Sequence, residues 1–173
     1  IADARADSVP IIAITGQVNT TQIGTDAFQE ADTFGLSFPI TKHSILVKSP
    51  EELLEAIPRA FEIALNGRPG PVLIDVPRNV QLAECEFKEW PDISKVRVHD
   101  IRFHTPIDEY AEKMGQIADL LSKAKKPVLF CGGGCNSVEA SAGIQNFVNN
   151  YPLPLVTSLM GLESVQNRYL DGR

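Results

Sequence analysis

Two glycine-containing loops, each following an apolar run, carry residue types that could do chemistry. The first follows residues 10–15, which predict a buried strand, and opens at Gly16. It continues into the string GTDAFQE at residues 24–30, where Asp26 is predicted to begin a short helix over residues 26–33. The free N–H groups of a helix start carry partial positive charge, so they could face an anion. α/β enzymes place ligands in such loops, and we therefore interpret this loop as a candidate ligand site.

The second loop follows the apolar residues 127–131 and contains Gly132, Gly133 and Gly134. Glycines let a backbone approach a phosphate closely, and the helix predicted to follow adds its positive end. The run lacks the G-x-G-x-x-G spacing and an acidic residue after the next strand. From the residues alone, a nucleotide site and a tight structural turn stay equally open. The two cysteines that flank the glycines have no second pair or histidine nearby, so we expect packing residues and no metal site.

Two arginines flank a third apolar run, residues 71–77. Arg68 lies in the string GRPGP, between a helix stop and a strand start, where prolines restrict the backbone. A guanidinium held there could donate a forked pair of hydrogen bonds to a phosphate or a ring carbonyl. A surface arginine at a turn is the simpler interpretation of the local residues. Arg78 follows the same run and places a cation at the carboxyl edge of the predicted sheet, where open α/β sheets bind ligands.

Alternating strands and helices must position these loops. Apolar runs predict strands at residues 10–15, 43–48, 71–77, 127–131 and 153–157. Capped or amphipathic segments predict helices over residues 26–33, 49–66, 105–121 and 137–149. Uniformly apolar strands that alternate with helices predict an α/β fold, with parallel sheets covered by helices on both faces.

The helix start at Ser49 is the clearest in the chain. Ser49 is the expected N-cap, Pro50 occupies the first helical position, and Glu52 is placed to close a capping box. The pair Asn66-Gly67 predicts the end of this helix. Its predicted apolar face is broad and consists of Leu53, Leu54, Ile57, Phe61, Ile63, Ala64 and Leu65.

Residues 82–105 break this alternation with mixed charges and no sustained period. We interpret them as a linker between a first domain at residues 1–81 and a second at residues 106–173. The chain starts at Ile1 without a methionine and stops at Arg173 without a closing element. We therefore expect an excised piece of a longer protein.

The composition excludes several functional classes. A net charge of −6 with scattered basic residues does not favour binding to nucleic acid. No apolar run approaches membrane-spanning length, so no membrane partner is expected. Three cysteines are too few and odd in number for a disulfide framework, which favours the cytoplasm.

Six strings in this sequence follow one another as they do in a known family. They are ITGQV, IGTDAFQEAD, ITKHS, GRPGPVLIDVPR, KKPVLFCGGGC and SLMGL, and together they cover nearly the whole chain. The sequence resembles the large catalytic subunit of acetolactate (acetohydroxyacid) synthase, in the superfamily of thiamine-diphosphate enzymes. The resemblance implies the C-terminal half of a pyrimidine-binding domain, followed by the start of a Rossmann-like central domain that binds FAD.

The resemblance also implies roles for individual residues. Phe28 and Gln29 match loop residues that approach the active site at a subunit interface, and Arg78 matches a position in the substrate channel. The positions that match flavin-binding residues of the family are Arg68, Gly132, Gly133, Gly134, Ser158, Leu159 and Met160. Two positions depart from the family pattern: lysine is usual where Arg78 stands, and proline is frequent where Asn19 stands.

The activity implied by the resemblance belongs to a longer enzyme. Such an enzyme decarboxylates pyruvate and condenses the two-carbon unit with a second 2-oxo acid, either pyruvate or 2-oxobutyrate. The implied cofactors are thiamine diphosphate, Mg²⁺ and FAD, and the implied partners are identical subunits in a dimer or tetramer and a regulatory small subunit. The family's cofactor-activating glutamate lies upstream of Ile1 and its metal-binding GDG motif lies downstream of Arg173, so we expect no activity from this piece alone.

Two alternatives remain at this point. One is another thiamine-diphosphate enzyme, of the glyoxylate carboligase or pyruvate oxidase type, against which the string GTDAFQE argues. The other is a nucleotide-binding module without catalytic activity. Bound flavin in the longer protein would argue against this second alternative.

Overall fold

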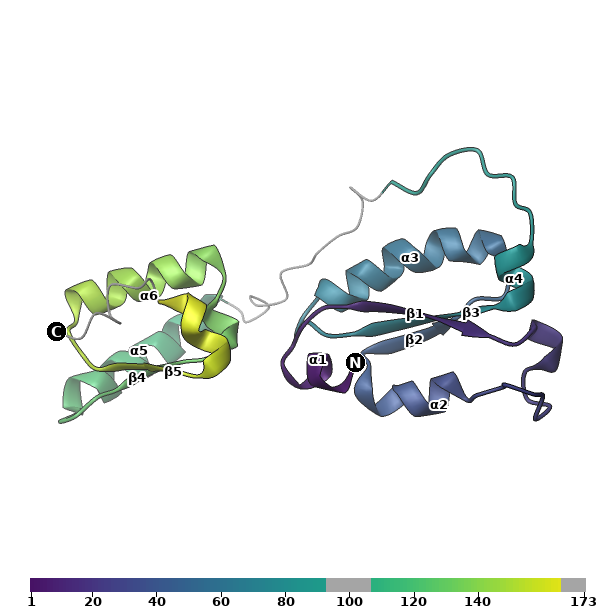
Figure 1. The fold of residues 1–173 in the computed structure, drawn as a ribbon. Coiled ribbons are helices and arrows are strands. Elements are labelled where there is room, and N and C mark those ends of the chain that lie inside the picture. The colour runs from purple at the N-terminus through teal and green to yellow at the C-terminus, as the bar shows by residue number, and fades with distance from the viewer. Residues whose placement is uncertain (93–106, 166–173) are drawn as a thin grey trace. The chain divides into compact units, whose positions relative to one another are not determined.

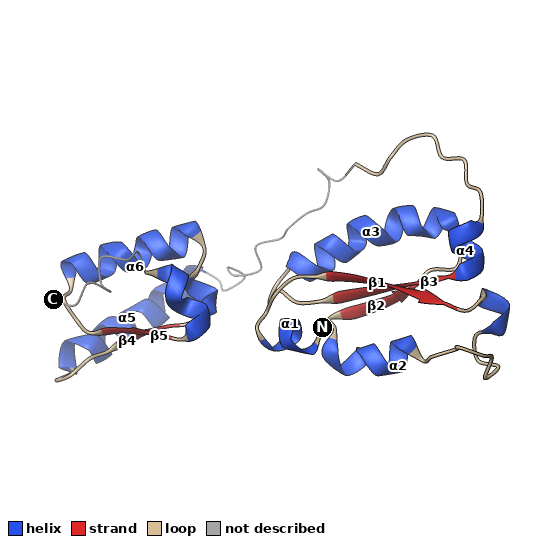
Figure 2. Cartoon of the chain, in the orientation of Figure 1, coloured by secondary structure: helices blue, strands red, loops and turns tan. Residues whose placement is uncertain are grey.

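The computed structural model describes residues 1–92 and 107–165 of the 173-residue chain. The chain divides into two compact units, Ile1–His104 and Thr105–Arg173 (Figure 1). Each unit contains a parallel sheet with helices beside it, as Figure 2 shows. The predicted α/β class is therefore confirmed. Residues 93–105 of the predicted linker, and with them the predicted start of the helix over residues 105–121, lie outside the described residues.

The first unit is built on a three-stranded sheet with β3 in the centre. Its elements are α1 (Ala2–Ala6), β1 (Ile12–Gln17), η1 (Thr20–Gln22), α2 (Thr33–Ser37), η2 (Phe38–Ile40), β2 (His43–Leu46), α3 (Pro50–Leu65), β3 (Val72–Pro77) and α4 (Arg78–Leu82). Both β1 and β2 pair with β3 in parallel, and residues 12 and 43 lie opposite residue 72. The carboxyl ends of β1 and β3 therefore meet at one edge of the sheet, where the loops of interest begin.

The core of the first unit lies between β3 and α3. Every residue of β3 is buried, including Val72, Ile74 and Val76, which point to the same face because side chains alternate along a strand. Each such aliphatic side chain stabilises the fold by about 1.5–3 kcal/mol when fully buried. α3 covers this face with three alanines spaced four residues apart, Ala56, Ala60 and Ala64. Small side chains at this spacing let the helix lie close to the sheet.

Two predictions about burial need correction. The broad apolar face predicted for α3 is narrower than expected, because Phe61 and Leu65 are exposed. The strand at residues 10–15 does not end at Gly16 but continues to Gln17, and Ile14 within it is 65% exposed. The physical reason is its position: β1 is an edge strand, so α3 covers β3 and does not extend over Ile14. Only β3 has the burial on both faces that was predicted for all the strands of this sheet.

The ends of α3 follow the sequence signals. Ser49 accepts a hydrogen bond from the N–H of Glu52 at 3.3 Å, and the helix continues through Pro58 to Leu65. Glu52 accepts from the N–H of Lys48 at 2.7 Å, one residue before the N–H expected for a capping box. Beyond the helix, Gly67 has a φ of 62°, a left-handed conformation that glycine adopts without strain.

The second unit is a βαβ structure. Its elements are α5 (Ile107–Lys123), β4 (Leu129–Cys131), η5 (Gly133–Cys135), α6 (Val138–Asn150), β5 (Leu155–Thr157) and η6 (Leu159–Ser164). β4 and β5 pair in parallel, with Leu129 opposite Leu155, and α6 connects them after the N-cap Ser137. The predicted βαβ unit with glycines at its first turn is confirmed. Within the two described segments of the chain, no helix is long and apolar enough to cross a membrane.

Candidate functional site

The loop between β1 and α2 folds around the carboxylate of Glu30. The N–H of Gly24 donates to Oε1, and the N–H groups of Thr25 and Ala27 donate to Oε2 at 3.2 and 3.0 Å. These hydrogen bonds lower the pKa of Glu30, with the Gly24 amide as the largest cause and partial burial opposing it. The N–H groups of this loop therefore do face an anion, but that anion is the chain's own side chain.

The helix predicted over residues 26–33 is wrong. Asp26 and Gln29 have φ values of 55° and 66°, and a left-handed residue interrupts an α-helix. α2 begins only at Thr33, after the N-cap Asp32, whose carboxylate accepts from the N–H of Gly35 at 2.8 Å. An aspartate does cap a helix start here, but that aspartate is Asp32 and not Asp26.

Phe28 and Gln29, the residues expected near the active site, lie in the exposed part of this loop. The side chain of Phe28 is 89% exposed, and Gln29 is also exposed. Both side chains are thus available for contact with a substrate or a second chain.

Arg78 is exposed and begins α4 at the carboxyl end of β3. The next residue, Asn79, joins this helix to the loop that follows β1. Its Oδ1 accepts from the N–H of Thr20 at 2.9 Å, and its Nδ2 donates to the Thr20 hydroxyl at 3.1 Å. The structure therefore brings the element that starts with Arg78 to the same sheet edge as the loop that carries Phe28 and Gln29.

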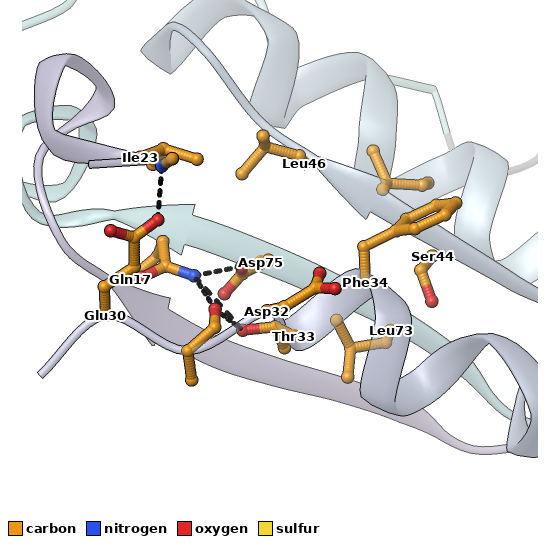
Figure 3. Close-up of a pocket in the computed structure, with 13 residues that line it drawn as sticks. Gln17, Ile23, Glu30, Asp32, Thr33, Phe34, Ser44, Leu46, Leu73 and Asp75 are labelled. Carbon is orange, nitrogen blue, oxygen red and sulfur yellow. Dashed lines mark hydrogen bonds between the residues drawn. The ribbon is translucent and has the colours of Figure 1, made fainter. Parts of the chain in front are cut away.

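A cavity of about 220 Å³ lies between the loop that follows β1, helix α2 and the face of the sheet that α3 does not cover (Figure 3). Its walls are formed by Gln17, Ile23, Gly24, Glu30, Ala31, Asp32, Thr33, Phe34, Ser44, Ile45, Leu46, Leu73 and Asp75. Phe28, Gln29 and Arg78 are not among these residues, so the cavity and the predicted catalytic positions are adjacent but different.

The polar centre of the cavity was missed by the sequence reasoning. Asp75 is buried in β3 and accepts from the Thr15 hydroxyl at 2.7 Å and from Gln17 Nε2 at 3.2 Å. Gln17 Nε2 also lies within hydrogen-bonding distance of the Ala31 carbonyl at 2.8 Å and the Thr33 hydroxyl at 3.2 Å, as the dashed lines in Figure 3 show. One signal in the sequence could have identified this centre: Asp75 is the single acidic residue in the apolar run of residues 71–77. A carboxylate buried in a strand needs hydrogen-bond partners, so polar side chains had to lie beside it.

Arg68 lies at the turn between α3 and β3 and contacts the end of α1. Its Nε donates to the Ser8 hydroxyl at 2.7 Å, and one terminal nitrogen donates to the Ala6 carbonyl at 2.8 Å. The guanidinium therefore donates both of these hydrogen bonds within the first unit. It lies at the amino end of β3, whereas the loop with Phe28 lies at the carboxyl end of the sheet.

In the second unit, the structure brings most of the predicted cofactor-binding positions together. Gly132, Gly133 and Gly134 follow β4, and Ser158, Leu159 and Met160 follow β5, its parallel neighbour. A Cβ placed on Gly133 would lie 3.0 Å from the Met160 Cβ, and one on Gly132 would lie 3.9 Å from the Ser158 hydroxyl. Two segments separated by a whole helix in sequence therefore lie side by side at the carboxyl edge of this sheet.

The two turns are held together by hydrogen bonds and leave open space beside Gly134. The N–H of Ser158 donates to the Cys131 carbonyl at 3.0 Å, and the side chain of Asn136 donates to the Met160 carbonyl at 2.7 Å. A Cβ on Gly134 would have no atom within 4 Å, so this glycine faces open space. The arrangement offers backbone and open volume to a ligand, as a phosphate or dinucleotide site does.

The cysteines and acidic residues do not form a metal centre in the part of the chain that the structure describes. Cys131 is buried, and its pKa is raised by burial first and by the neighbouring Cys135 second. The interpretation of Cys131 as a packing residue is confirmed.

Comparison with known proteins shows which family this chain resembles. Residues 114–170 match the thiamine pyrophosphate enzyme central domain. The acetolactate synthase large subunit of Corynebacterium glutamicum is 45% identical over 163 residues, which are 94% of this chain and 25% of that protein. The acetolactate synthase isozyme 2 large subunit of Escherichia coli is 42% identical over 170 residues, which are 98% of this chain and 29% of that protein.

The chain belongs to the family of thiamine pyrophosphate enzymes. Within that family its similarity is to acetolactate synthase large subunits, and this confirms the resemblance carried by the six sequence strings. The chain spans roughly a quarter of the length of these relatives, 25% in one case and 29% in the other.

Proposed function

We propose that this chain is part of an acetolactate synthase large subunit, a transferase that acts on 2-oxo acids. The observation that carries the proposal is the identity of 45% over 94% of the chain. Glyoxylate carboligase, pyruvate oxidase and a module without catalysis are not favoured by these relatives. The whole enzyme decarboxylates pyruvate and joins the two-carbon unit to a second 2-oxo acid, pyruvate or 2-oxobutyrate.

The residues of this chain contribute binding and orientation. Arg78, exposed at the carboxyl edge of the sheet, attracts the carboxylate of a 2-oxo acid. Phe28 supplies an apolar wall that excludes water, and Gln29 supplies an amide that donates to or accepts from the substrate. Thiamine diphosphate, when bound, supplies the chemistry that holds the two-carbon unit. None of these three side chains needs to transfer a proton for these roles.

The second unit supports FAD as a further cofactor. The two carboxyl-end turns of β4 and β5 meet, Gly134 faces open volume, and α6 starts directly beyond the first turn. These residues fit a dinucleotide, with Gly132, Gly133 and Gly134 beside its phosphates and Ser158, Leu159 and Met160 beside its other parts. Arg68 stays a predicted flavin-binding residue, and its hydrogen-bond partners in the structure are Ser8 and Ala6.

Mg²⁺ does not fit the residues at hand. No group of three His, Cys, Asp or Glu side chains that could hold a metal occurs in residues 1–92 and 107–165. We therefore assign no metal ligand among the residues that the structure describes.

The domain assignment is part of the same proposal. Residues 1–81 form the C-terminal part of a pyrimidine-binding domain, residues 82–105 connect the domains, and residues 106–173 begin the central domain. The family match at residues 114–170 supports the last of these assignments. The expected assembly is a homodimer or homotetramer in the cytoplasm, with a regulatory small subunit as a further partner.

The test is an assay of the full-length protein that contains this sequence. With thiamine diphosphate and Mg²⁺, it should form acetolactate from pyruvate, and its absorbance spectrum should show flavin. The isolated 173-residue chain is the matched control and should form no acetolactate above buffer, because it spans only about a quarter of the length of its relatives and its described residues hold no group that could bind a metal. A full-length protein without this activity would overturn the proposal.

A further inference from the structure

We propose that Glu30 is a positioning residue, whose carboxylate holds residues 24–30 in the conformation that presents Phe28 and Gln29. The catalytic consequence of this role depends on the proposed function. The conformation of the loop is inferred from hydrogen bonds within the loop alone. The role assigned to Glu30 is exerted through the loop alone.

Both oxygens of Glu30 are occupied by the backbone of its own loop. Oε1 accepts from the N–H of Gly24, and Oε2 accepts from the N–H groups of Thr25 and Ala27 at 3.2 and 3.0 Å. The N–H of Glu30 itself donates to the Ala27 carbonyl at 2.9 Å. Residue 30 is therefore joined to residues 24, 25 and 27 by both its side chain and its backbone.

The backbone of this loop needs such a restraint. Asp26 and Gln29 adopt left-handed φ values of 55° and 66°, which L-residues other than glycine adopt at a cost in free energy. Gly24, with a φ of 82°, is the one residue of the three that adopts this region without strain. Strained residues persist only where surrounding contacts hold them, and here those contacts converge on one carboxylate.

Phe28 and Gln29 lie between Ala27 and Glu30, which are joined by a hydrogen bond from the Ala27 N–H to the Glu30 carboxylate. Ala27 donates to the carboxylate, and Glu30 carries it, so the two residues between them form a short projecting arc. The far side of the arc is fixed by Gln17, which donates to the Ala31 carbonyl at 2.8 Å. Releasing the carboxylate would let Gln29 leave its left-handed conformation and change the direction of both side chains.

Two conservative variants remove the restraint in different ways. Glu30→Gln keeps the length but replaces one acceptor oxygen by an NH₂ group, which then faces N–H donors. Glu30→Asp keeps the charge but is one methylene shorter, so it cannot reach all three amides. Glu52→Gln is the matched control, because Glu52 also accepts from a backbone N–H, that of Lys48 at 2.7 Å, away from this loop.

The first readout is hydrogen–deuterium exchange of the full-length protein, in peptides that cover residues 22–32. Exchange at Gly24, Thr25 and Ala27 should rise about tenfold or more in Glu30→Gln and Glu30→Asp, as expected for the loss of charge-assisted hydrogen bonds. Glu52→Gln should leave these peptides unchanged. Unchanged exchange in both Glu30 variants would overturn the proposal.

The second readout separates positioning from stability. In Glu30→Gln, kcat for acetolactate formation should fall about tenfold while KM for pyruvate changes less, since misplaced groups lose orientation in the transition state. The melting temperature at neutral pH should fall by only about 2 °C, because the loop is exposed. A purely structural role would lower the melting temperature by much more than this and leave kcat unchanged. Faster exchange with unchanged kcat would equally reject positioning.

The two proposals fail in different ways. If the unmodified full-length protein forms no acetolactate, the proposed function fails, and the exchange experiment still decides whether Glu30 holds the loop. If that protein is active and Glu30→Gln matches it in both exchange and kcat, the proposed function stands and the role of Glu30 is rejected.

Discussion

Thr15 on β1 donates a hydrogen bond to Asp75 on β3 at 2.7 Å, across the two strands whose carboxyl ends lead to the loop with Phe28 and to Arg78. Asp75 is only 6% exposed, and its second oxygen accepts from Gln17 at 3.2 Å. A buried carboxylate is stable only when its oxygens have partners. This pair therefore ties the stability of the sheet to the loop that Gln17 holds over the cavity.

Asp75→Ala should destabilise the first unit by about 1–3 kcal/mol, because Thr15 and Gln17 lose their acceptor inside the protein. Asp75→Asn keeps the shape and one acceptor oxygen, and it should cost less. The measurement is thermal unfolding of the full-length protein. Glu109→Ala is the control: it removes only the exposed pair of Glu109 with Lys113, which contributes about 0.5 kcal/mol or less. Equal melting temperatures for Asp75→Ala and Glu109→Ala would contradict the prediction.

Gly161→Ala should destabilise the second unit more than alanine at any other glycine that the structure describes there. An added Cβ would lie 2.4 Å from the Cys131 carbonyl oxygen and 3.0 Å from its carbon, and neither backbone atom can move cheaply. We expect a loss of about 2 kcal/mol or more, since the turns after β4 and β5 must separate.

Gly143→Ala is the control for this prediction. Gly143 lies inside α6 with no atom within 4 Å of an added Cβ. Alanine there should raise stability by about 0.5–1 kcal/mol, because glycine costs conformational entropy in a helix. If both substitutions move the melting temperature in the same direction, the close contact of Gly161 with Cys131 is not the deciding feature.

Much of the fold could be predicted from local signals. Ser49, Pro50 and the Asn66-Gly67 pair bound α3 correctly because caps and turns depend on nearby residues. The strand at residues 71–77 was also predicted, since a central strand is apolar on both faces. The exposure of Ile14 could not be predicted, because an apolar edge strand and an apolar central strand have the same sequence pattern.

The candidate site was predictable only in part. The turn at Gly132, Gly133 and Gly134 was predicted because consecutive glycines directly after an apolar run indicate a loop where the backbone is closely approached. The Glu30 contacts were missed because they depend on left-handed residues at Asp26 and Gln29, which no periodic pattern reveals. Asp75 was missed as a site residue since its partners are 60 and 58 residues away in sequence.

Arg68→Ala in the full-length protein should reduce flavin retention much more than stability. The side chain lies at an exposed turn, and its bonds to Ser8 and Ala6 are exposed, so their loss leaves no cavity in the core. If the guanidinium binds flavin, each charge-assisted hydrogen bond contributes about 1.5–3 kcal/mol, or roughly tenfold to a hundredfold in affinity.

Arg68→Lys should recover only part of this affinity, because an ammonium cannot reproduce the fork. The measurement is flavin affinity together with a melting curve recorded without flavin. Ser8→Ala is the control, since it removes one intramolecular partner of Arg68 and leaves the guanidinium in place. Unchanged flavin affinity in Arg68→Ala would return Arg68 to the interpretation of a surface arginine at a turn.

The stabilisation that Glu30 gives to its loop should depend on pH in a defined direction. Backbone amides, that of Gly24 first, lower the pKa of Glu30 from its ordinary value of 4.5. A carboxyl with a lowered pKa in the folded state stabilises that state fully above the unfolded pKa, and this contribution disappears as the pH falls through the folded pKa. The effect of Glu30 should therefore be constant at neutral pH and shrink only below about pH 4.5.

The measurement is the difference in melting temperature between the unmodified full-length protein and Glu30→Gln, recorded from about pH 3 to pH 8. Glutamine does not titrate, so the carboxylate of Glu30 is the group that the difference isolates. We expect a plateau above about pH 5.5 and a decrease toward zero in acid, because protonated Glu30 can no longer accept bonds at both oxygens. A difference that grows as the pH falls would mean that the carboxylate is disfavoured in the folded loop, which contradicts the hydrogen bonds from Gly24, Thr25 and Ala27.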